Sequence, residues 1–150
     1  MILGFHATKL VVADLAAAEA FYRAIGMRLV AHNDGGEGEV HQRQSWLSAS
    51  GDSGSHMLIL SEFPEAPAPP LPAYPRECWL ALQVADVEAL LVAAVTAGGR
   101  VLRAGEDRPE HGVRAAVLAD NEGHIIEVVG PIAAVTAPLV DPLARGAARG

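Results

Sequence analysis

The 150-residue chain has one cysteine, one lysine and few aromatic side chains, which make up only 5% of its residues. Its single cysteine, Cys78, can form no disulfide within the chain and no metal cluster of its own. There is no run of Lys or Arg, and the net charge of −7 argues against a nucleic-acid partner. No apolar stretch approaches the ~20 residues of a membrane span, so we expect no membrane partner either.

With 51% hydrophobic and 19% charged residues, the chain has the composition of one ordinary globular domain. A chain of this length buries enough surface to fold without disulfides or a structural metal. Its first ten residues lack the charged segment and long apolar stretch of a signal peptide, so we expect a cytoplasmic location. Abundant Ala, Gly, Pro and Arg with little Lys are typical of a GC-rich bacterial genome.

The sequence contains one internal repeat. Residues 12–15 (VADL) match 84–87 (VADV), and residues 26–30 (GMRLV) match 98–102 (GGRVL), both at an offset of 72. Two separate matches at one ungapped offset indicate a tandem duplication, which has to be recognised before any element is assigned. We therefore predict two modules with the same order of elements.

Each module is predicted to run β-α-β-β-β. The first strands end near Asp14 and Asp86, whose carboxylates can cap the helices that follow. Gly26 and Gly98 should end these helices. The expected helices are 15–25 and 87–97, and the expected strands are 5–12, 28–33, 40–50 and 56–63 in module one and 78–84, 100–105, 113–119 and 124–130 in module two.

The two modules are separated by a proline-rich segment. Residues 64–75 contain six prolines. A proline has no backbone N–H, so it can neither continue a helix nor donate a hydrogen bond to a sheet. We therefore predict a single domain made of module one (5–63), a stiff linker (64–75), module two (77–130) and a tail (131–150).

The order of these motifs resembles the vicinal oxygen chelate (VOC) superfamily, which contains glyoxalase I, extradiol dioxygenases, fosfomycin-resistance enzymes and bleomycin-binding proteins. The resemblance rests on V-x-D before each helix, Phe21-Tyr22, Gly26-Met27 and a closing D-x-E-G-x-x-x-E from Asp120 to Glu127, and it covers residues 5–130. It implies an α+β fold in which two tandem β-α-β-β-β modules form a curved mixed sheet, a half-barrel, around a central pocket. It also implies a homodimer, with modules paired within one chain or across two.

In the metal-dependent members of that superfamily, the strands supply up to four ligands to one divalent ion. The matching positions here are Ala7, Ile59, Trp79 and Glu127, and only Glu127 carries a donor. Because a divalent ion normally needs three or more protein ligands, we expect no metal and no other cofactor. The alternative is one Mn, Fe, Ni or Zn ion held by Glu127 and His6, which a β-bulge over residues 6–8 would turn into the pocket.

Side-chain alternation along the strands predicts what the pocket contains. If Ala7 faces the pocket, Lys9 on the same strand faces it too, and the same alternation places Trp79 and Gln83 of strand 78–84 there. One face of strand 40–50, which carries polar and aromatic side chains, is expected to line the pocket as well. The candidate ligand-binding residues are Lys9, Gln42, Gln44, Trp46, Trp79 and Gln83. An apolar wall with a few polar groups is typical of a small-molecule site.

Several of these residues have two interpretations. Glu127 is a catalytic general base or a counter-ion for a cationic ligand, or it forms an ion pair with Lys9 that joins the modules. Trp79 is a stacking platform or a plug in the space of a metal. His111 is expected in a loop at the pocket mouth, and Cys78 is expected to be a small buried residue.

The sequence therefore favours a glyoxalase or bleomycin-resistance-like homodimer that binds a small, partly planar organic molecule without metal. The alternative is a VOC enzyme of lyase, isomerase or dioxygenase type, with Glu127 as general base or as a metal ligand beside a displaced His6. A third interpretation is a protein whose site has decayed and whose dimer surface carries its role. The sequence does not identify the ligand.

Overall fold

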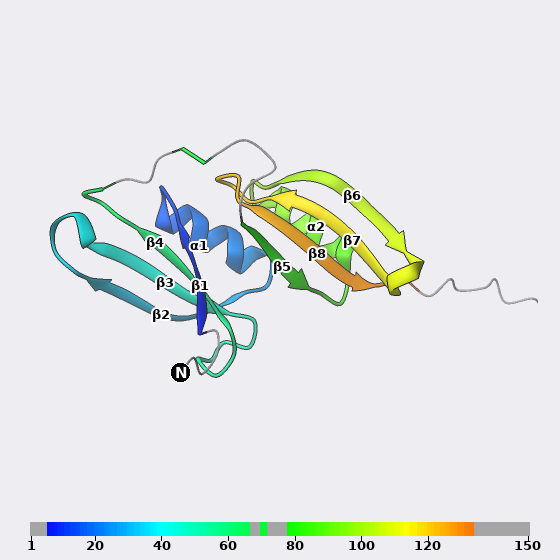
Figure 1. Ribbon diagram of the computed structural model, residues 1–150, viewed down its shortest axis with the longest axis horizontal. Coiled ribbons are helices and arrows are strands. Elements are labelled where there is room, and N and C mark those ends of the chain that lie inside the picture. Colours follow the sequence, from blue (N-terminus) through cyan, green and yellow to red (C-terminus); the bar gives the residue numbers. More distant parts are fainter. Residues whose placement is uncertain (1–5, 67–69, 72–77, 134–150) are drawn as a thin grey trace, which may run out of the picture.

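The computed structural model describes residues 6–66, 70, 71 and 78–133, which form two modules lying side by side (Figure 1). Module one contains β1 (Ala7–Val11), α1 (Leu15–Ala24), β2 (Arg28–Gly35), η1 (Gly38–Val40), β3 (Gln42–Ser48) and β4 (Met57–Glu62). Module two contains β5 (Trp79–Gln83), α2 (Val87–Thr96), β6 (Arg100–Arg108), η2 (Pro109–His111), β7 (Val113–Ala119) and β8 (Ile125–Pro131). The predicted order β-α-β-β-β is confirmed in both.

Each module has its own mixed four-stranded sheet, in the order β1-β4-β3-β2 in the first sheet and β5-β8-β7-β6 in the second. The first strand of each module runs parallel to the last, and the remaining neighbours are antiparallel. Both sheets are curved, as predicted (Figure 1). Among the described residues no strand of one sheet pairs with a strand of the other, so β1 and β5 are edge strands.

The helices begin where the sequence predicts. A carboxylate oxygen of Asp14 accepts a hydrogen bond from the Ala17 amide at 2.9 Å, and Asp86 caps α2 in the same way through Ala89, also at 2.9 Å. Each helix ends one residue before its predicted end, and the glycine that follows at 26 or 98 has a φ of +107° or +96°. Glycine adopts this left-handed conformation without the steric cost of a side chain.

Two strands are longer than predicted: β2, which continues to Gly35 and not to residue 33, and β6. The sequence places the end of β6 at residue 105, but the strand continues to Arg108, and its charged end pairs with β7 through Asp107–Arg114 and Arg108–Val113. A charged segment can remain in a strand here because β6 is an edge strand with one side open to solvent.

The hydrophobic core lies between the helices and one face of each sheet, and it spans both modules. Phe21 and Tyr22 of α1 are 1% and 0% exposed, and their rings meet edge to face with centroids 5.3 Å apart. Module two approaches this pair closely at Gly99, where an added Cβ would lie 2.8 Å from the Phe21 ring. Gly99, the residue after the glycine that ends α2, therefore allows close packing between the modules.

Each helix packs on one face of its own sheet. The opposite face of each sheet carries no helix and is called its open face below.

Cys78 is exposed, and the expectation that it is buried is wrong. Residues 67–69 and 72–75 of the predicted linker, residues 76 and 77 after it, and 134–150 of the predicted tail lie outside the described residues. No helix in the described part of the chain has the length and apolar character that a membrane crossing requires.

Candidate functional site

The open face of the first sheet carries four of the predicted ligand-binding residues. Along β1, Leu10 is buried in the core while Lys9 is exposed on the opposite face. Along β3, the Ser45 hydroxyl donates to Glu19 of α1 at 2.6 Å, which fixes Ser45 on the helix side. The alternating residues of β3 therefore occupy the open face: Gln42, Gln44 and Trp46.

These side chains form a connected polar array. Lys9 Nζ donates to Gln42 Oε1 at 3.2 Å, and Gln44 Nε2 donates to the same oxygen at 2.7 Å. The Trp46 indole donates to Gln44 Oε1 at 3.0 Å. Gln44 is only 4% exposed and its amide is committed to these bonds, whereas the ammonium of Lys9 and the amide nitrogen of Gln42 keep N–H groups to offer a ligand.

Of the interpretations of Glu127, the ion pair with Lys9 is not formed between these two described residues. Lys9 is bonded to Gln42 within module one, whereas Glu127 lies on β8 of module two. Sequence alternation identified the face of each residue correctly, but it contained no information about the placement of one module relative to the other.

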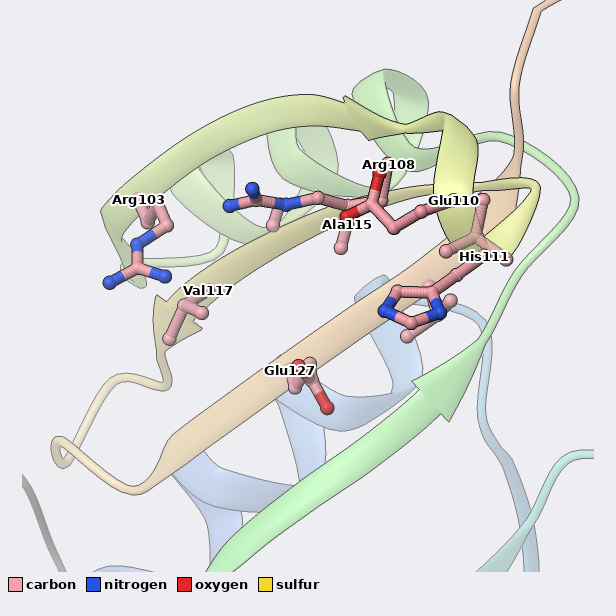
Figure 2. A pocket seen from close by; sticks show the side chains of 10 residues that line it. Arg103, Arg108, Glu110, His111, Ala115, Val117 and Glu127 are labelled. Carbon is pink, nitrogen blue, oxygen red and sulfur yellow. The ribbon is translucent and has the colours of Figure 1, made fainter.

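The open face of the second sheet is hollowed around Glu127 (Figure 2). The hollow has a volume of about 420 Å³ and is called the Glu127 hollow below. Its floor is apolar and comes mainly from β7 and β8, and its rim is charged. The lining residues are Arg103, Arg108, Glu110, His111, Val113, Ala115, Ala116, Val117, Glu127 and Val129.

Strand register fixes the position of Glu127 in the middle of the second sheet. Ala81 of β5 pairs with Glu127, Glu127 pairs with Val117 of β7, and Val117 pairs with Arg103 of β6. The half-buried carboxylate thus stands in a row between two small apolar side chains. It forms no hydrogen bond or ion pair with any residue that the structure describes, so its oxygens are available to a ligand.

The structure places Trp79 and Gln83 on the same open face but outside the Glu127 hollow. Gln83 lines a neighbouring hollow of about 590 Å³ together with Val129 and Pro131. Trp79 is 37% exposed and lines a smaller pocket with Met57 of module one, at the boundary between the modules. Within one chain, Trp79, Gln83 and Glu127 thus lie on the second sheet, apart from the array on the first.

Two basic residues of the hollow, Arg103 and Arg108, were not selected from the sequence, and a third, His111, was noted there without being chosen as a ligand-binding residue. Arg103 and Arg108 come from β6, and His111, expected only at a loop near the pocket mouth, comes from η2. The register of β6 shifts between Val101 and Arg103 and again between Arg103 and Glu106. Each shift interrupts the alternation of side chains, so the faces of these arginines could not be read from spacing.

The donor set does not fit a divalent metal ion. In the described ranges, no group of three or more His, Cys, Asp or Glu side chains could hold one. The bulge that would turn His6 inward is absent, because β1 pairs with β4 in unbroken register from Ala7 to Val11. His6 is exposed and precedes β1, in the module opposite to Glu127.

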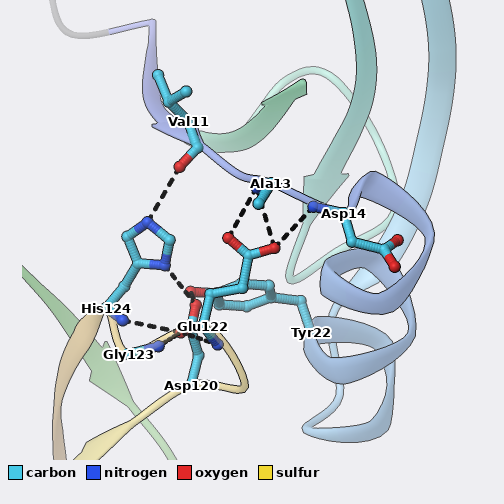
Figure 3. A network of polar contacts seen from close by, with 8 residues as sticks. All are labelled: Val11, Ala13, Asp14, Tyr22, Asp120, Glu122, Gly123 and His124. Atoms are coloured by element: carbon cyan, nitrogen blue, oxygen red, sulfur yellow. Dashed lines mark hydrogen bonds and ion pairs between the residues drawn. The ribbon is translucent and has the colours of Figure 1, made fainter. Parts of the chain in front are cut away.

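The D-x-E-G motif has a structural role at the contact between the modules (Figure 3). One carboxylate oxygen of Asp120 accepts the amides of residues 122, 123 and 124, at 2.7–3.0 Å. The other accepts the Tyr22 hydroxyl at 2.9 Å and contacts Nδ1 of His124 at 2.8 Å. Nε2 of His124 lies 3.2 Å from the carbonyl oxygen of Val11 in β1.

Both nitrogens of His124 face acceptors, so the imidazolium form suits this position. Burial lowers the pKa of His124, but the hydrogen bond and charge of Asp120 and the Val11 carbonyl outweigh burial and raise it. Burial raises the pKa of Asp120, but His124 and Tyr22 outweigh burial and lower it. The pKa of Tyr22 lies well above its ordinary value because of burial and the negative charge of Asp120.

Glu122 completes the contact between the modules. Its carboxylate accepts hydrogen bonds from the backbone amides of Ala13 and Asp14, at distances of 2.8–3.0 Å. The residues that join the modules, called the junction below, are therefore Val11, Ala13, Asp14, Tyr22, Asp120, Glu122 and His124. Four of them are specified positions of the motifs on which the resemblance rests, namely Asp14, Tyr22, Asp120 and Glu122, but spacing alone did not predict that they meet.

Comparison with known proteins agrees with this architecture. The sequence model described as "Glyoxalase/Bleomycin resistance protein/Dioxygenase superfamily" matches residues 4–128. No curated protein sequence matches the chain. Among solved structures, the chain is similar to a glyoxalase family protein from Bacillus cereus, with a TM-score of 0.75 and 18% identity over 88% of this chain and 96% of that one.

Two further solved structures have the same fold. A trypanothione-dependent glyoxalase I from Leishmania major matches with a TM-score of 0.66 and 22% identity, over 85% of this chain and 86% of that one. A fosfomycin resistance protein from Mesorhizobium loti matches with a TM-score of 0.61 and 16% identity, over 89% and 95%. At such identities the likeness establishes the fold and leaves the ligand to be argued from this chain's own residues.

Proposed function

Because the chain belongs to the Glyoxalase/Bleomycin resistance protein/Dioxygenase superfamily, we propose that it binds a small, partly planar organic molecule on the open faces of its sheets, without a metal ion. The observation that carries this proposal is the Glu127 hollow, in which a carboxylate stands on a floor of Ala and Val side chains. A mainly apolar wall with a few polar groups is typical of small-molecule sites. The cytoplasmic location expected from the sequence belongs to the same proposal.

The open face of the first sheet supports the same class of ligand. Lys9 and Gln42 offer N–H donors, and the ring of Trp46 is held in place by its bond to Gln44. A fixed indole beside amide groups suits a flat molecule that carries polar substituents. The predicted role of these residues in ligand binding is part of the proposal.

A homodimer would enclose the ligand between these faces. We propose that the first sheet of one chain meets the second sheet of another, because each open face lacks a helix and both β1 and β5 are edge strands in the described part of the chain. Val11 and Trp79 are 38% and 37% exposed near those edges. Sedimentation equilibrium should give twice the chain mass of 15.6 kDa, and a mass of one chain at all concentrations would overturn the dimer.

Ligand binding is tested by quenching of tryptophan fluorescence, since Trp46 and Trp79 are the two tryptophans of the chain. The probes are a panel of aminobenzoates, aminobenzamides, phenols and heteroaromatic amines. We expect Glu127→Gln to weaken binding of the best probe about tenfold, because it removes a charged acceptor. Glu39→Gln, an exposed acid in η1, is the matched control. Absence of binding across the panel, or wild-type binding by Glu127→Gln, would overturn the proposal.

A second candidate function is a metal-independent lyase or isomerase with Glu127 as general base. The observation that favours it is that His111 lines the same hollow, so one site offers a carboxylate and an imidazole for proton transfer. Turnover of a bound probe, followed by NMR and lost in Glu127→Gln while binding persists, would establish it. The dioxygenase alternative needs a metal, which the donor set does not fit.

A further inference from the structure

The charges of the Glu127 hollow are separated across the sheet, and this separation defines a ligand class; the inference rests on the proposed function. Arg103 and Arg108 lie along the β6 side, His111 lies at the η2 end, and Glu127 stands across from the arginines on β8 (Figure 2). We infer that the hollow selects an organic acid, whose carboxylate pairs with Arg103 while an amine or hydroxyl group of the same molecule donates to Glu127.

The register gives the spacing between the two charges. Arg103 pairs with Val117 on the neighbouring strand, and Val117 pairs with Glu127 on the next. Adjacent strands lie about 4.8 Å apart, so the backbones at Arg103 and Glu127 are separated by about 10 Å. Arg103 and Glu127 form no ion pair, and the apolar Val117 lies between them. This spacing suits a molecule with its acid and its donor on opposite sides of one aromatic ring.

Arg103 is the basic group that is available to an anion. Arg108 already donates to Glu106 at 2.8 Å, which neutralises part of its charge. Arg103 forms no hydrogen bond or ion pair with any residue in the described ranges, although it lines the hollow. A guanidinium presents its donors in a planar fork that matches a carboxylate, so Arg103 is the expected partner of the acid.

The net charge of the whole chain is opposite in sign to the arginines of the hollow. With a net charge of −7, the protein repels anions at long range. Within the hollow, the carboxylates of Glu110 and Glu127 balance the two arginines, so positive charge is confined to the β6 side, where Arg103 and Arg108 lie. An acid bound there depends on short-range contacts with these residues, and added salt should weaken its binding.

The test compares two probes of similar shape, the anionic 4-aminobenzoate and the neutral 4-aminobenzamide, by isothermal titration calorimetry. Both carry an amine for Glu127, but only the first carries a carboxylate for Arg103. We expect the acid to bind at least about tenfold more tightly than the amide, as a charge-assisted bond would give. Arg103→Gln should weaken binding of the acid about tenfold and change binding of the amide less than about twofold. Unchanged amide binding also shows that the variant is folded.

Arg100→Gln is the matched control, because Arg100 lies on the same strand and is not among the side chains that line the hollow. It should keep the wild-type preference for the acid. If the wild-type protein binds the amide as tightly as the acid, or if Arg103→Gln keeps the preference, the inference is overturned while the proposed function stands. If neither these probes nor any member of the wider panel binds, both are overturned.

Discussion

The hydroxyl of Tyr22 on α1 donates a hydrogen bond of 2.9 Å to the carboxylate of Asp120, which lies 98 residues away in the other module. Both side chains are buried, with exposures of 0% and 4%. Because the junction also holds His124 against Val11 and Glu122 against the start of α1, the modules are joined by polar bonds as well as by a shared core. We expect them to unfold as one cooperative unit.

Replacement of Tyr22 by Phe removes only the donor. We expect Tyr22→Phe to lower the free energy of unfolding by about 1–3 kcal/mol, because it removes a bond to a buried carboxylate. Urea denaturation measures the loss. Ser55→Ala, which removes an exposed hydroxyl contact with Ser50, is the control and should change stability by less than about 0.5 kcal/mol. Equal effects of the two substitutions would contradict a structural role of the Tyr22 bond.

The stability of the junction should depend on pH through His124. Its pKa is raised in the folded protein, so its contribution is complete below the ordinary value of 6.5 and is lost as the pH rises through the raised value. Asp120, whose pKa is lowered, contributes above its ordinary value of 3.8 and loses that contribution as the pH falls through the lowered one. The stabilising effect of His124 should therefore be greatest at about pH 5–6 and decline above pH 6.5.

The measurement is the difference in unfolding free energy between the wild-type protein and His124→Gln from pH 5 to pH 9. We expect this difference to narrow as the pH rises. His41, whose pKa is raised chiefly by its hydrogen bond to Asp34, is present in both proteins, so its effect cancels. A difference that is constant over this range, or that widens above pH 7, would show that His124 is not held as an imidazolium.

Gly99 should tolerate no side chain. An added Cβ would lie 2.8 Å from both the Ala119 carbonyl oxygen and the Phe21 ring, and backbone cannot move aside easily. We expect Gly99→Ala to destabilise the protein by about 1–3 kcal/mol through overpacking. Gly35→Ala is the matched control, because the nearest atom to its Cβ would be 3.8 Å away and its φ is not left-handed. Thermal unfolding of both variants tests this, and equal melting temperatures would contradict it.

Glu122 should stabilise the folded protein through its charge and not through its size. Glu122→Gln leaves a side chain of similar shape but offers the amides of Ala13 and Asp14 a weaker acceptor, so we expect a loss of about 1–2 kcal/mol. Glu39→Gln, at an exposed position, should cost less than about 0.5 kcal/mol. Chemical denaturation at low salt compares the two, and an equal loss in both variants would mean that Glu122 does not join the modules.

The local features of the fold could be predicted because their signals are local. Asp14, Asp86, Gly26 and Gly98 each act on the few residues beside them, and the repeat fixed the order of the elements. Alternation also grouped Gln42, Gln44 and Trp46 on one face of β3. The long-range features could not be found in this way. That Lys9 meets Gln42 depends on how strands from distant parts of the chain pair.

The basic side of the hollow was missed for a related reason. The two register shifts in β6 move Arg103 out of simple alternation, and the charged residues up to Arg108 look like a loop when read without their partners on β7. The junction was also invisible, because Tyr22, Asp120 and Glu122 match the superfamily's motifs without any sign that they contact one another. A polar residue at a motif position can equally serve the fold or the ligand, and only the relative position of the modules distinguishes these roles.

The most direct test of the central claim is a ¹H–¹⁵N correlation NMR titration of the full chain with 4-aminobenzoate. We expect shifts in the amides of β7 and β8 around Val117 and Glu127, with shifts at the Arg103 guanidinium, and little change in α1. Shifts confined to the hollow beside α1, which Glu19, His32 and Arg43 line, would place the ligand on the helix side of the first sheet and contradict the account. A spectrum unchanged at millimolar concentrations of the acid would contradict it as well.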